Sequence, residues 1–406
     1  MKYRGSDMAG KAGSTKTSIL TYGLFVMTLT HTLTHVFGRL YTATFPLIRE
    51  EFLLTSWQLG MIAAIPPLCQ AVLSIPVGLL CDRIGSKRML LISMLFAVAG
   101  SLLAATAVNP LMLVVAISLV YLNTTFYHPA SYSFTTQLFS GENRPRALGI
   151  HGAGGTFGMA LGPLTLSIFL GYLGLTWRNV YLFWAIPIIL GTFLVLRVDF
   201  SEIEEEEPQR GGGGGGSGDA TSLITPALLT FLVYTAMRTM AAQMISPFMP
   251  IFMVDEKGFT VDQMGFIYGS LSISGLISAP LGGVFASRFG SKRWLATTIF
   301  LNTVLLGVVA VAPGGWPFVV AYMVYGFSGT LGMAARSDII ARLTPRSQRG
   351  LGYSLLFLPG SVMGAISPLF SAKLIEALGF SQLFPIAIGV SVVSLLILVL
   401  GIKVKA

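Results

Sequence analysis

Charged residues are scarce in this chain of 406 residues. Only 11% of the residues are Asp, Glu, Lys or Arg, whereas 53% are hydrophobic, and the mean hydropathy is +0.75. A soluble globular protein carries roughly 25% charged residues, and a single core cannot hide this much apolar surface from water. The scarcity of charge therefore excludes a soluble protein and predicts a polytopic helical membrane protein.

Motifs for catalysis and for ATP use are also missing. The sequence has no G-x-x-x-x-G-K-[S/T] phosphate loop, because the run Gly211–Gly216 lacks the lysine and the strand–helix frame. It has no E-x-x-H or H-E-x-x-H pattern. The two cysteines, Cys69 and Cys81, lie on one predicted helix about 18 Å apart, too far to form a disulfide. We therefore expect that the protein is not an enzyme and uses no cofactor. We expect an ion gradient to be its energy source.

Twelve apolar runs are each near or above the roughly 20 residues needed to cross a bilayer. If both termini are cytoplasmic, the outer loops keep only Arg49, Arg178, Lys257 and Lys373 of the basic residues. This positive-inside pattern predicts a multi-pass protein of the plasma or inner membrane with both ends cytoplasmic. It also accounts for the net charge of +9 without nucleic acid. The predicted helices are 18–46, 57–80, 88–107, 111–138, 147–171, 177–197, 222–252, 263–286, 293–313, 316–341, 348–371 and 380–402.

One segment occurs twice: GLLCDRIGSKR at 78–88 returns as GVFASRFGSKR at 283–293, each time between two apolar runs. The repeat predicts an all-α duplication of two pseudo-symmetric six-helix bundles, with a substrate path between them. The predicted organisation is a tail (1–17), a bundle (18–198), an acidic and Gly-rich linker (199–222), a second bundle (223–402) and a tail (403–406). The linker is expected to be a solvated tether, with a partner-binding segment as the alternative.

These features together resemble the major facilitator superfamily over essentially the whole chain. The resemblance implies that the repeated turn G-x-x-x-D-R-x-G-x-K-R helps to gate the cytoplasmic side. Ser287 stands in place of the acid in the second copy. A tight, positive-inside turn without a gating role is the alternative. The implied gating residues are Gly78, Asp82, Arg83, Gly85, Gly283, Arg288 and Gly290.

The fifth predicted helix carries Gly149, Gly158, Gly162 and Pro163 with the spacing G-x8-G-x3-G-P. This spacing resembles the antiporter motif of the superfamily, although the closing glycine pair of that motif is absent. The resemblance implies gating roles for Gly158, Gly162 and Pro163. Physically, glycines allow close approach of a neighbouring helix and proline allows a kink. Ordinary packing by small residues is the alternative.

A more local resemblance concerns the fourth and fifth predicted helices. The segments FYHPAS at 126–131, RALG at 146–149 and GGTFGMALGP at 154–163 are similar to those of fosmidomycin-resistance-type exporters. The similarity implies efflux of a drug or of a small anion.

Ionisable side chains within the predicted helices are costly in a membrane and mark functional positions. The predicted helices contain three arginines, Arg39, Arg238 and Arg336, but a single acid among their deep residues, Asp338. The substrate path between the two bundles should therefore carry surplus positive charge and favour an anion. Structural pairing, packing or snorkelling to the interface are the alternatives. The predicted substrate contacts are Arg39, Arg238, Arg336, Tyr127, His128 and Gln243.

Histidine is the side chain best suited to proton exchange near neutral pH. His31 and His35, one turn apart, are therefore predicted proton carriers, and Asp338 is the competing carrier. Their i, i+4 spacing, with His128 as a third ligand, would also suit a metal ion. No carboxylate or cysteine lies nearby in the sequence, so no metal site is predicted. His151, near a helix end, is assigned to packing.

The sequence thus predicts a secondary active transporter that works by alternating access and exports a small organic anion or amphipathic drug in exchange for protons. An importer of an organic or inorganic anion is the alternative within transport. A histidine-metal membrane enzyme or a sensor is the alternative from another class. The expected partners are a small-molecule substrate, protons and the lipid bilayer, without nucleic acid, and the expected state is a monomer.

Overall fold

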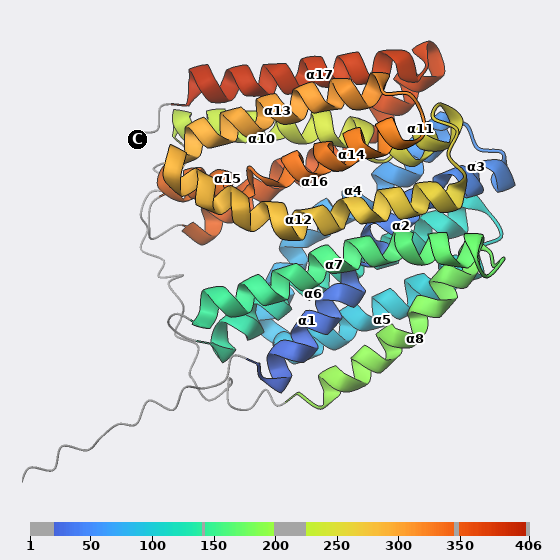
Figure 1. Cartoon of the computed structure of the whole chain (residues 1–406). Coiled ribbons are helices and arrows are strands. Elements are labelled where there is room, and N and C mark those ends of the chain that lie inside the picture. Colours follow the sequence, from blue (N-terminus) through green and yellow to red (C-terminus); the bar gives the residue numbers. More distant parts are fainter. Residues whose placement is uncertain (1–19, 140–142, 199–224, 345–348, 403–406) are drawn as a thin grey trace, which may run out of the picture.

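The computed structural model describes residues 20–139, 143–198, 225–344 and 349–402, and every regular element in these ranges is a helix (Figure 1). The first half contains α1 (Tyr22–His35), α2 (Phe37–Ala43), α3 (Phe45–Phe52), α4 (Ser56–Ile84), α5 (Ser86–Ala105), α6 (Pro110–Leu138), α7 (Asn143–Gly171) and α8 (Trp177–Leu196). The second half contains α10 (Pro226–Ile245), α11 (Met249–Asp255), α12 (Val261–Phe289), α13 (Ser291–Val311), α14 (Trp316–Thr330), α15 (Met333–Leu343), α16 (Arg349–Leu378), α17 (Phe380–Leu396) and the π-helix η3 (Ile397–Gly401).

Eleven segments of the described chain are long and apolar enough to cross a membrane. The first predicted span is not among these eleven segments. It is divided into α1, α2 and α3 of 14, 7 and 8 residues. A proline is the local cause of the last break: Pro46, in the first turn of α3, lacks the N–H that would continue a helix from α2. The predicted linker, 199–222, lies outside the described residues, so the domain boundaries stay a prediction.

The two halves repeat each other in local detail. Helices α4 and α12 both have 29 residues and both begin at a threonine–glutamine capping box, Thr55 with Gln58 and Thr260 with Gln263. Both end at a glycine with positive φ, 80° at Gly85 and 85° at Gly290. Only glycine adopts this conformation without strain. The predicted pair of pseudo-symmetric bundles is confirmed.

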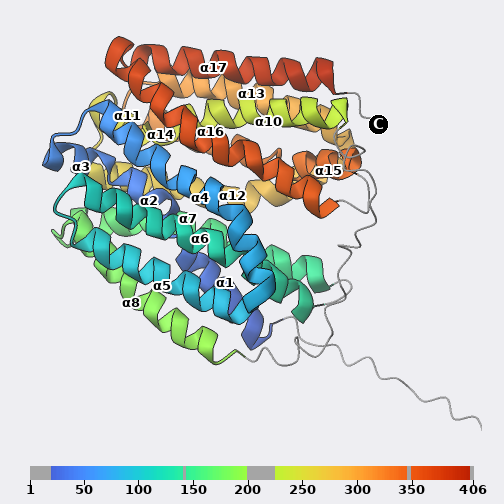
Figure 2. The ribbon, with the colours of Figure 1, turned by 180° about the vertical axis from the view of Figure 1, so that it is seen from behind.

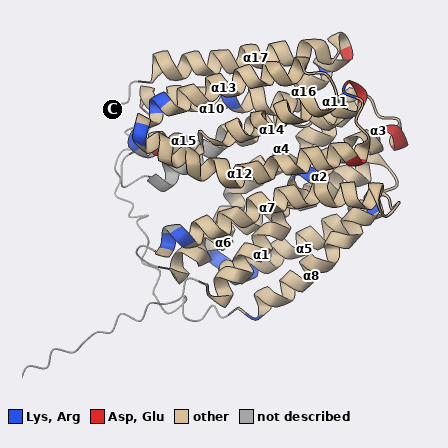
Figure 3. Cartoon of the chain, in the orientation of Figure 1, with Lys and Arg blue, Asp and Glu red and all other residues tan. Residues whose placement is uncertain are grey.

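The lysine of each repeated turn has the same task in both halves. Lys87 donates a hydrogen bond to the carbonyl of Val198 (3.1 Å), and Lys292 donates one to the carbonyl of Val399 (2.9 Å). These contacts tie the start of α5 to the carboxyl end of α8, and the start of α13 to η3 at the carboxyl end of α17. Most described Lys and Arg residues gather at this end of the molecule, and most Asp and Glu residues at the opposite end (Figure 3). We call these the basic end and the acidic end.

Two helix pairs join the halves: α7 packs on α12 (Figure 1), and α4 packs on α16 (Figure 2). Nearer the acidic end the backbones are close, because a methyl group added at Gly60 would lie 2.6 Å from Ala372 Cβ, and one at Gly265 would lie 2.9 Å from the Pro163 carbonyl oxygen. Four glycines on α4, α7 and α16 nearer the basic end have no neighbouring atom within 4 Å of such a methyl group: Gly78, Gly149, Gly152 and Gly360. The closest glycine contacts between the halves therefore lie nearer the acidic end.

Polar contacts fasten the halves at the acidic end. Arg49 of α3 makes a bidentate ion pair with Asp255 of α11, at 2.5 and 2.7 Å. The backbone N–H of Trp57 donates to Glu376 of α16 at 2.8 Å. We call these four residues the acidic-end latch. It crosses from one half to the other, so it must open if that end of the molecule opens.

Breaking the latch should shift the balance between conformations. Arg49 and Asp255 are each 32% exposed, and exposed pairs contribute about 0.2–1 kcal/mol, which corresponds to a shift of up to about fivefold. In spin-labelled protein with labels at Leu53 and Glu256, Arg49→Gln or Asp255→Asn should enlarge the long-distance population. The charge swap Arg49→Asp with Asp255→Arg should reverse that change. Identical distance distributions in all variants would contradict the latch.

The topology can be tested by cysteine labelling in intact cells. In a background of Cys69→Ala and Cys81→Ala, Arg83→Cys and Arg288→Cys should both resist a membrane-impermeant maleimide. Both residues are exposed at the basic end, which is expected to face the cytoplasm, where the reagent cannot reach them. Lys373→Cys, at the opposite end, is the control and should be labelled. Labelling of only one of the two turn cysteines would contradict the duplicated topology.

Candidate functional site

All four histidines of the chain come together inside the first half. His31 and His35 lie on α1, His128 on α6 and His151 on α7. The ring centroids are 4.1 Å apart for His31 and His151, 4.7 Å for His31 and His35, and 5.1 Å for His35 and His128. His31 is 3% exposed and His151 is fully buried. Sequence analysis grouped the first three histidines but placed His151 apart from them.

Glycines of α7 make room for this histidine cluster. A methyl group added at Gly155 would lie 2.7 Å from His31 Cε1 and 3.0 Å from His35 Cδ2. Methyl groups at Gly158 and Gly162 would collide with the carbonyl oxygens of Thr32 and Val36. Two of the predicted gating glycines are therefore positions where α7 approaches the α1–α2 backbone. Their role in gating stays a prediction.

Hydrogen bonds fix part of the cluster. His31 Nδ1 lies 2.6 Å from the carbonyl oxygen of His151. The hydroxyl of Tyr127 contacts Thr30 Oγ1 (2.8 Å) and donates to the Met27 carbonyl (2.7 Å). Tyr127 is fully buried, and these contacts hold α6 against α1. Its role as a substrate contact stays a prediction. Among the described residues, His31 Nε2, His128 Nδ1 and His151 Nδ1 are buried without a hydrogen-bond partner.

The predicted arginines lie on three other helices. Arg39 of α2 lies over the ring of Tyr268 from the opposite half, 5.0 Å from the ring centroid. Arg238 of α10 donates to Asn302 Oδ1, and Asn302 in turn donates to Ser328 Oγ at 2.9 Å. Arg336 of α15 keeps its buried Nε without a partner. Sequence analysis did not identify Tyr268 or Asn302, since neither carries a charge that would mark it.

None of these three arginines is in an ion pair within the described part of the chain. The ion pairs there are Arg49–Asp255, Arg178–Glu51, Arg342–Asp338 and Lys373–Glu376. All three arginines are half-buried, and charge is screened less there than in water. Their role as substrate contacts stays a prediction.

Two other predicted residues lie in more ordinary surroundings. Asp338 accepts hydrogen bonds from Ser291 Oγ (2.5 Å) and from Arg342 Nε (2.9 Å), and its side chain is 39% exposed. It joins α15 to the turn at Gly290, at the basic end, and its role in proton coupling stays a prediction. Gln243 faces α16, where a methyl group at Gly364 would lie 3.5 Å from its Nε2.

Apart from Pro163, the remaining predicted gating residues lie at the basic end. Arg83 and Arg288 are exposed, and a methyl group at Gly283 would lie 3.6 Å from Ala334 Cβ. The side chain of Asp82 lies outside what the structure describes. Pro163 directs its carbonyl at Gly265 of the second half, so it belongs to the interface between the halves.

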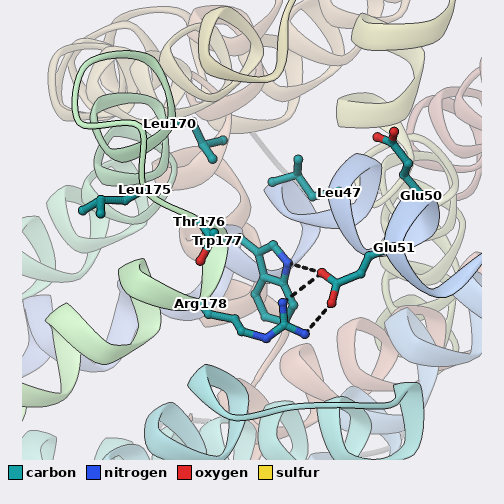
Figure 4. Close-up of a pocket in the computed structure, with 8 residues that line it drawn as sticks. All are labelled: Leu47, Glu50, Glu51, Leu170, Leu175, Thr176, Trp177 and Arg178. Atoms are coloured by element: carbon teal, nitrogen blue, oxygen red, sulfur yellow. Dashed lines mark hydrogen bonds and ion pairs between the residues drawn. The ribbon is translucent and has the colours of Figure 1, made fainter.

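A separate pocket of about 380 Å³ lies at the acidic end between α3, α7 and α8 (Figure 4). Its polar wall is Glu51, which accepts hydrogen bonds from Trp177 Nε1 (2.9 Å) and from both terminal nitrogens of Arg178 (2.9 and 2.5 Å). Glu51 and Arg178 are therefore paired with one another, and Glu50 is the other charged residue of the lining. The pocket therefore offers less unpaired charge to a ligand than the three arginines do.

The sequence matches the Major Facilitator Superfamily over residues 27–237 and 228–406. The chain belongs to this superfamily. The fosmidomycin resistance protein of Escherichia coli (strain K12) is 31% identical over 175 residues, which is 43% of each chain, so this match spans less than half of that relative. The multidrug resistance protein MdtG of Salmonella paratyphi C (strain RKS4594) is 28% identical over 353 residues, 83% of each chain.

Solved structures share the fold. A mutant of the nucleoside transporter NupG superposes with a TM-score of 0.79 at 15% identity, covering 94% of this chain and 100% of that one. A bacterial homolog of the human lysosomal transporter Spinster, in an inward-facing and occupied conformation, gives a TM-score of 0.71 at 17% identity, covering 93% and 94%. With the superfamily match and the eleven candidate spans, the chain is a multi-pass membrane transporter of this fold.

Gly158→Ala should destabilise the protein, because the added methyl group collides with the Thr32 carbonyl and forces α7 away from α1. Overpacking of this kind costs about 1–3 kcal/mol. Gly152→Ala, two turns earlier on the same helix, is the matched control because its methyl group meets no atom within 4 Å. Thermal unfolding in detergent should show a lower midpoint for Gly158→Ala alone. Equal midpoints would mean that the helices are not in close contact.

Proposed function

We propose that this protein is a secondary active exporter that carries a small organic anion out of the cell by alternating access, in exchange for protons. The observation that carries the proposal is the set of three interior guanidinium groups without a carboxylate partner, Arg39, Arg238 and Arg336. An anionic cargo would supply the missing negative charge. A lipophilic cation would instead be repelled.

Guanidinium groups suit carboxylate and phosphonate cargo. Their planar fork forms two parallel charge-assisted hydrogen bonds with such groups, and they are more weakly hydrated than an ammonium group. Arg39 belongs to the first half, whereas Arg238 and Arg336 belong to the second. An anion bound between them would contact both halves, and so would take part in the movement of one half against the other.

The conformation supports an export cycle that loads from the basic end. The latch closes the acidic end, whereas Gly78 of α4 and Gly360 of α16, nearer the basic end, have no neighbouring atom within 4 Å of an added methyl group. If the basic end is cytoplasmic, as the positive-inside pattern predicts, this state would admit cargo from the cytoplasm. The names of the fosmidomycin and multidrug resistance relatives favour export as the direction.

The proposal requires flux that depends on both the cargo and the proton gradient. Purified protein in liposomes should move organic anions, including a phosphonate, faster with an opposing proton gradient than without one. Inward movement that needs a parallel proton gradient would support the importer instead. No movement of any anion, with cations transported, would contradict the anion proposal.

Arg238→Gln should weaken cargo binding roughly ten- to hundredfold, because one charge-assisted contact contributes about 1.5–3 kcal/mol. Arg238→Lys should also weaken it, since a point charge does not replace the planar fork. Arg197→Gln, which changes an exposed arginine at the end of α8, is the control. Binding of anionic cargo to the purified variants is the measurement. Wild-type affinity in Arg238→Gln would favour a neutral cargo held by aromatic side chains.

A further inference from the structure

The histidine cluster has a geometry that the transport proposal does not use. We propose that His31, His35 and His128 form a binding site for a divalent transition-metal ion of the zinc class. One ring nitrogen from each of the three lies within 4.8 Å of the other two. The ligands come from two helices, with His31 and His35 one turn apart on α1 and His128 on α6.

The orientation of His31 prepares it as a ligand. Its Nδ1 faces the carbonyl oxygen of His151 at 2.6 Å, and a carbonyl only accepts, so Nδ1 carries the proton and Nε2 holds a free lone pair. That Nε2 is buried without a hydrogen-bond partner. Metal-binding histidines commonly donate their second ring N–H to a backbone carbonyl, which fixes the tautomer and the ring.

His128 also has a ring nitrogen available to an ion. His128 Nδ1 is also buried without a partner, and its ring centroid lies 5.4 Å from that of His31. Around a tetrahedral zinc ion with Zn–N distances of about 2.0–2.1 Å, the nitrogens lie roughly 3.4 Å apart. Small side-chain rotations would close the cluster to that distance. An ion bound by His31 Nε2 and His128 Nδ1 would give partners to two of the three buried histidine nitrogens that lack one, His151 Nδ1 being the third.

The ligand set selects the class of ion. Three neutral imidazoles suit Zn²⁺, Cu²⁺, Ni²⁺ or Fe²⁺, whereas Mg²⁺ and Ca²⁺ require oxygen ligands. Three protein ligands leave a fourth position for water or another small ligand. Sequence analysis set a metal aside because it required a carboxylate or a cysteine nearby. The fold places His128 of α6, the third ligand considered from the sequence, next to the pair on α1.

Metal binding competes with the predicted proton role of the same side chains, because a nitrogen that coordinates an ion carries no proton. The site is otherwise independent of the proposed function, since it involves none of the three arginines. Binding measured in detergent, without cargo or a proton gradient, therefore tests the metal site alone. The transport proposal is tested separately, by the flux experiment in liposomes.

The test uses full-length protein with any polyhistidine tag removed and metals stripped by a chelator. Co²⁺ added to the wild type should give the intense visible absorption of a four-coordinate site, and Zn²⁺ should displace it. His35→Gln and His128→Gln should each weaken binding by at least about tenfold. Tyr132→Phe is the control, since this ring neighbours His31 and His128 at 6.3 and 6.0 Å but offers no ligand in the cluster.

A second measurement needs only the wild type, in case a histidine variant fails to fold. Zn²⁺ should raise the thermal unfolding midpoint in a concentration-dependent way, because an ion that binds only the folded state stabilises it. Mg²⁺ at the same concentration should not. Absence of both the Co²⁺ absorption and the Zn²⁺ shift would overturn the proposal. Wild-type Zn²⁺ affinity in folded His35→Gln and His128→Gln would overturn it as well.

Discussion

The close packing of α7 against both α1 and α12 is the constraint on which the rest of the site depends. Lipid chains are as apolar as leucine, so helices in a membrane associate through close contact and not through exclusion of water. Gly158 and Gly162 bring α7 onto α1 and α2, and Gly265 and Gly269 bring α12 onto α7. The same helix therefore borders the histidine cluster on one side and the opposite half on the other.

The two halves share a fold but differ in interior chemistry. The first half contains every histidine, whereas the second contributes Arg238 and Arg336. Duplication explains the shared parts, namely the capping boxes, the positive-φ glycines and the lysines that hold the last helix of each half.

Sequence alone predicted the features that depend on local pattern. The repeated turn, the apolar spans and the three interior arginines are each visible in a short stretch of residues. The division of the first span, the latch between Arg49 and Asp255 and the place of His151 were not predicted. These depend on contacts between residues far apart in the chain, and a helix of uniform apolarity does not reveal which face meets which neighbour.

The same distinction applies to the proposed metal site, which the sequence did not predict. The sequence identified His31 and His35 as a possible metal pair with His128 as a third ligand, but it gave no measure of how close His128 lies to the pair. The glycines of α7 make room for the pair, because Gly155 admits the His31 and His35 rings where any larger side chain would displace them. Residues without functional groups thus determine which functional groups meet, and a position such as Gly155 belongs to the site as much as the imidazoles beside it.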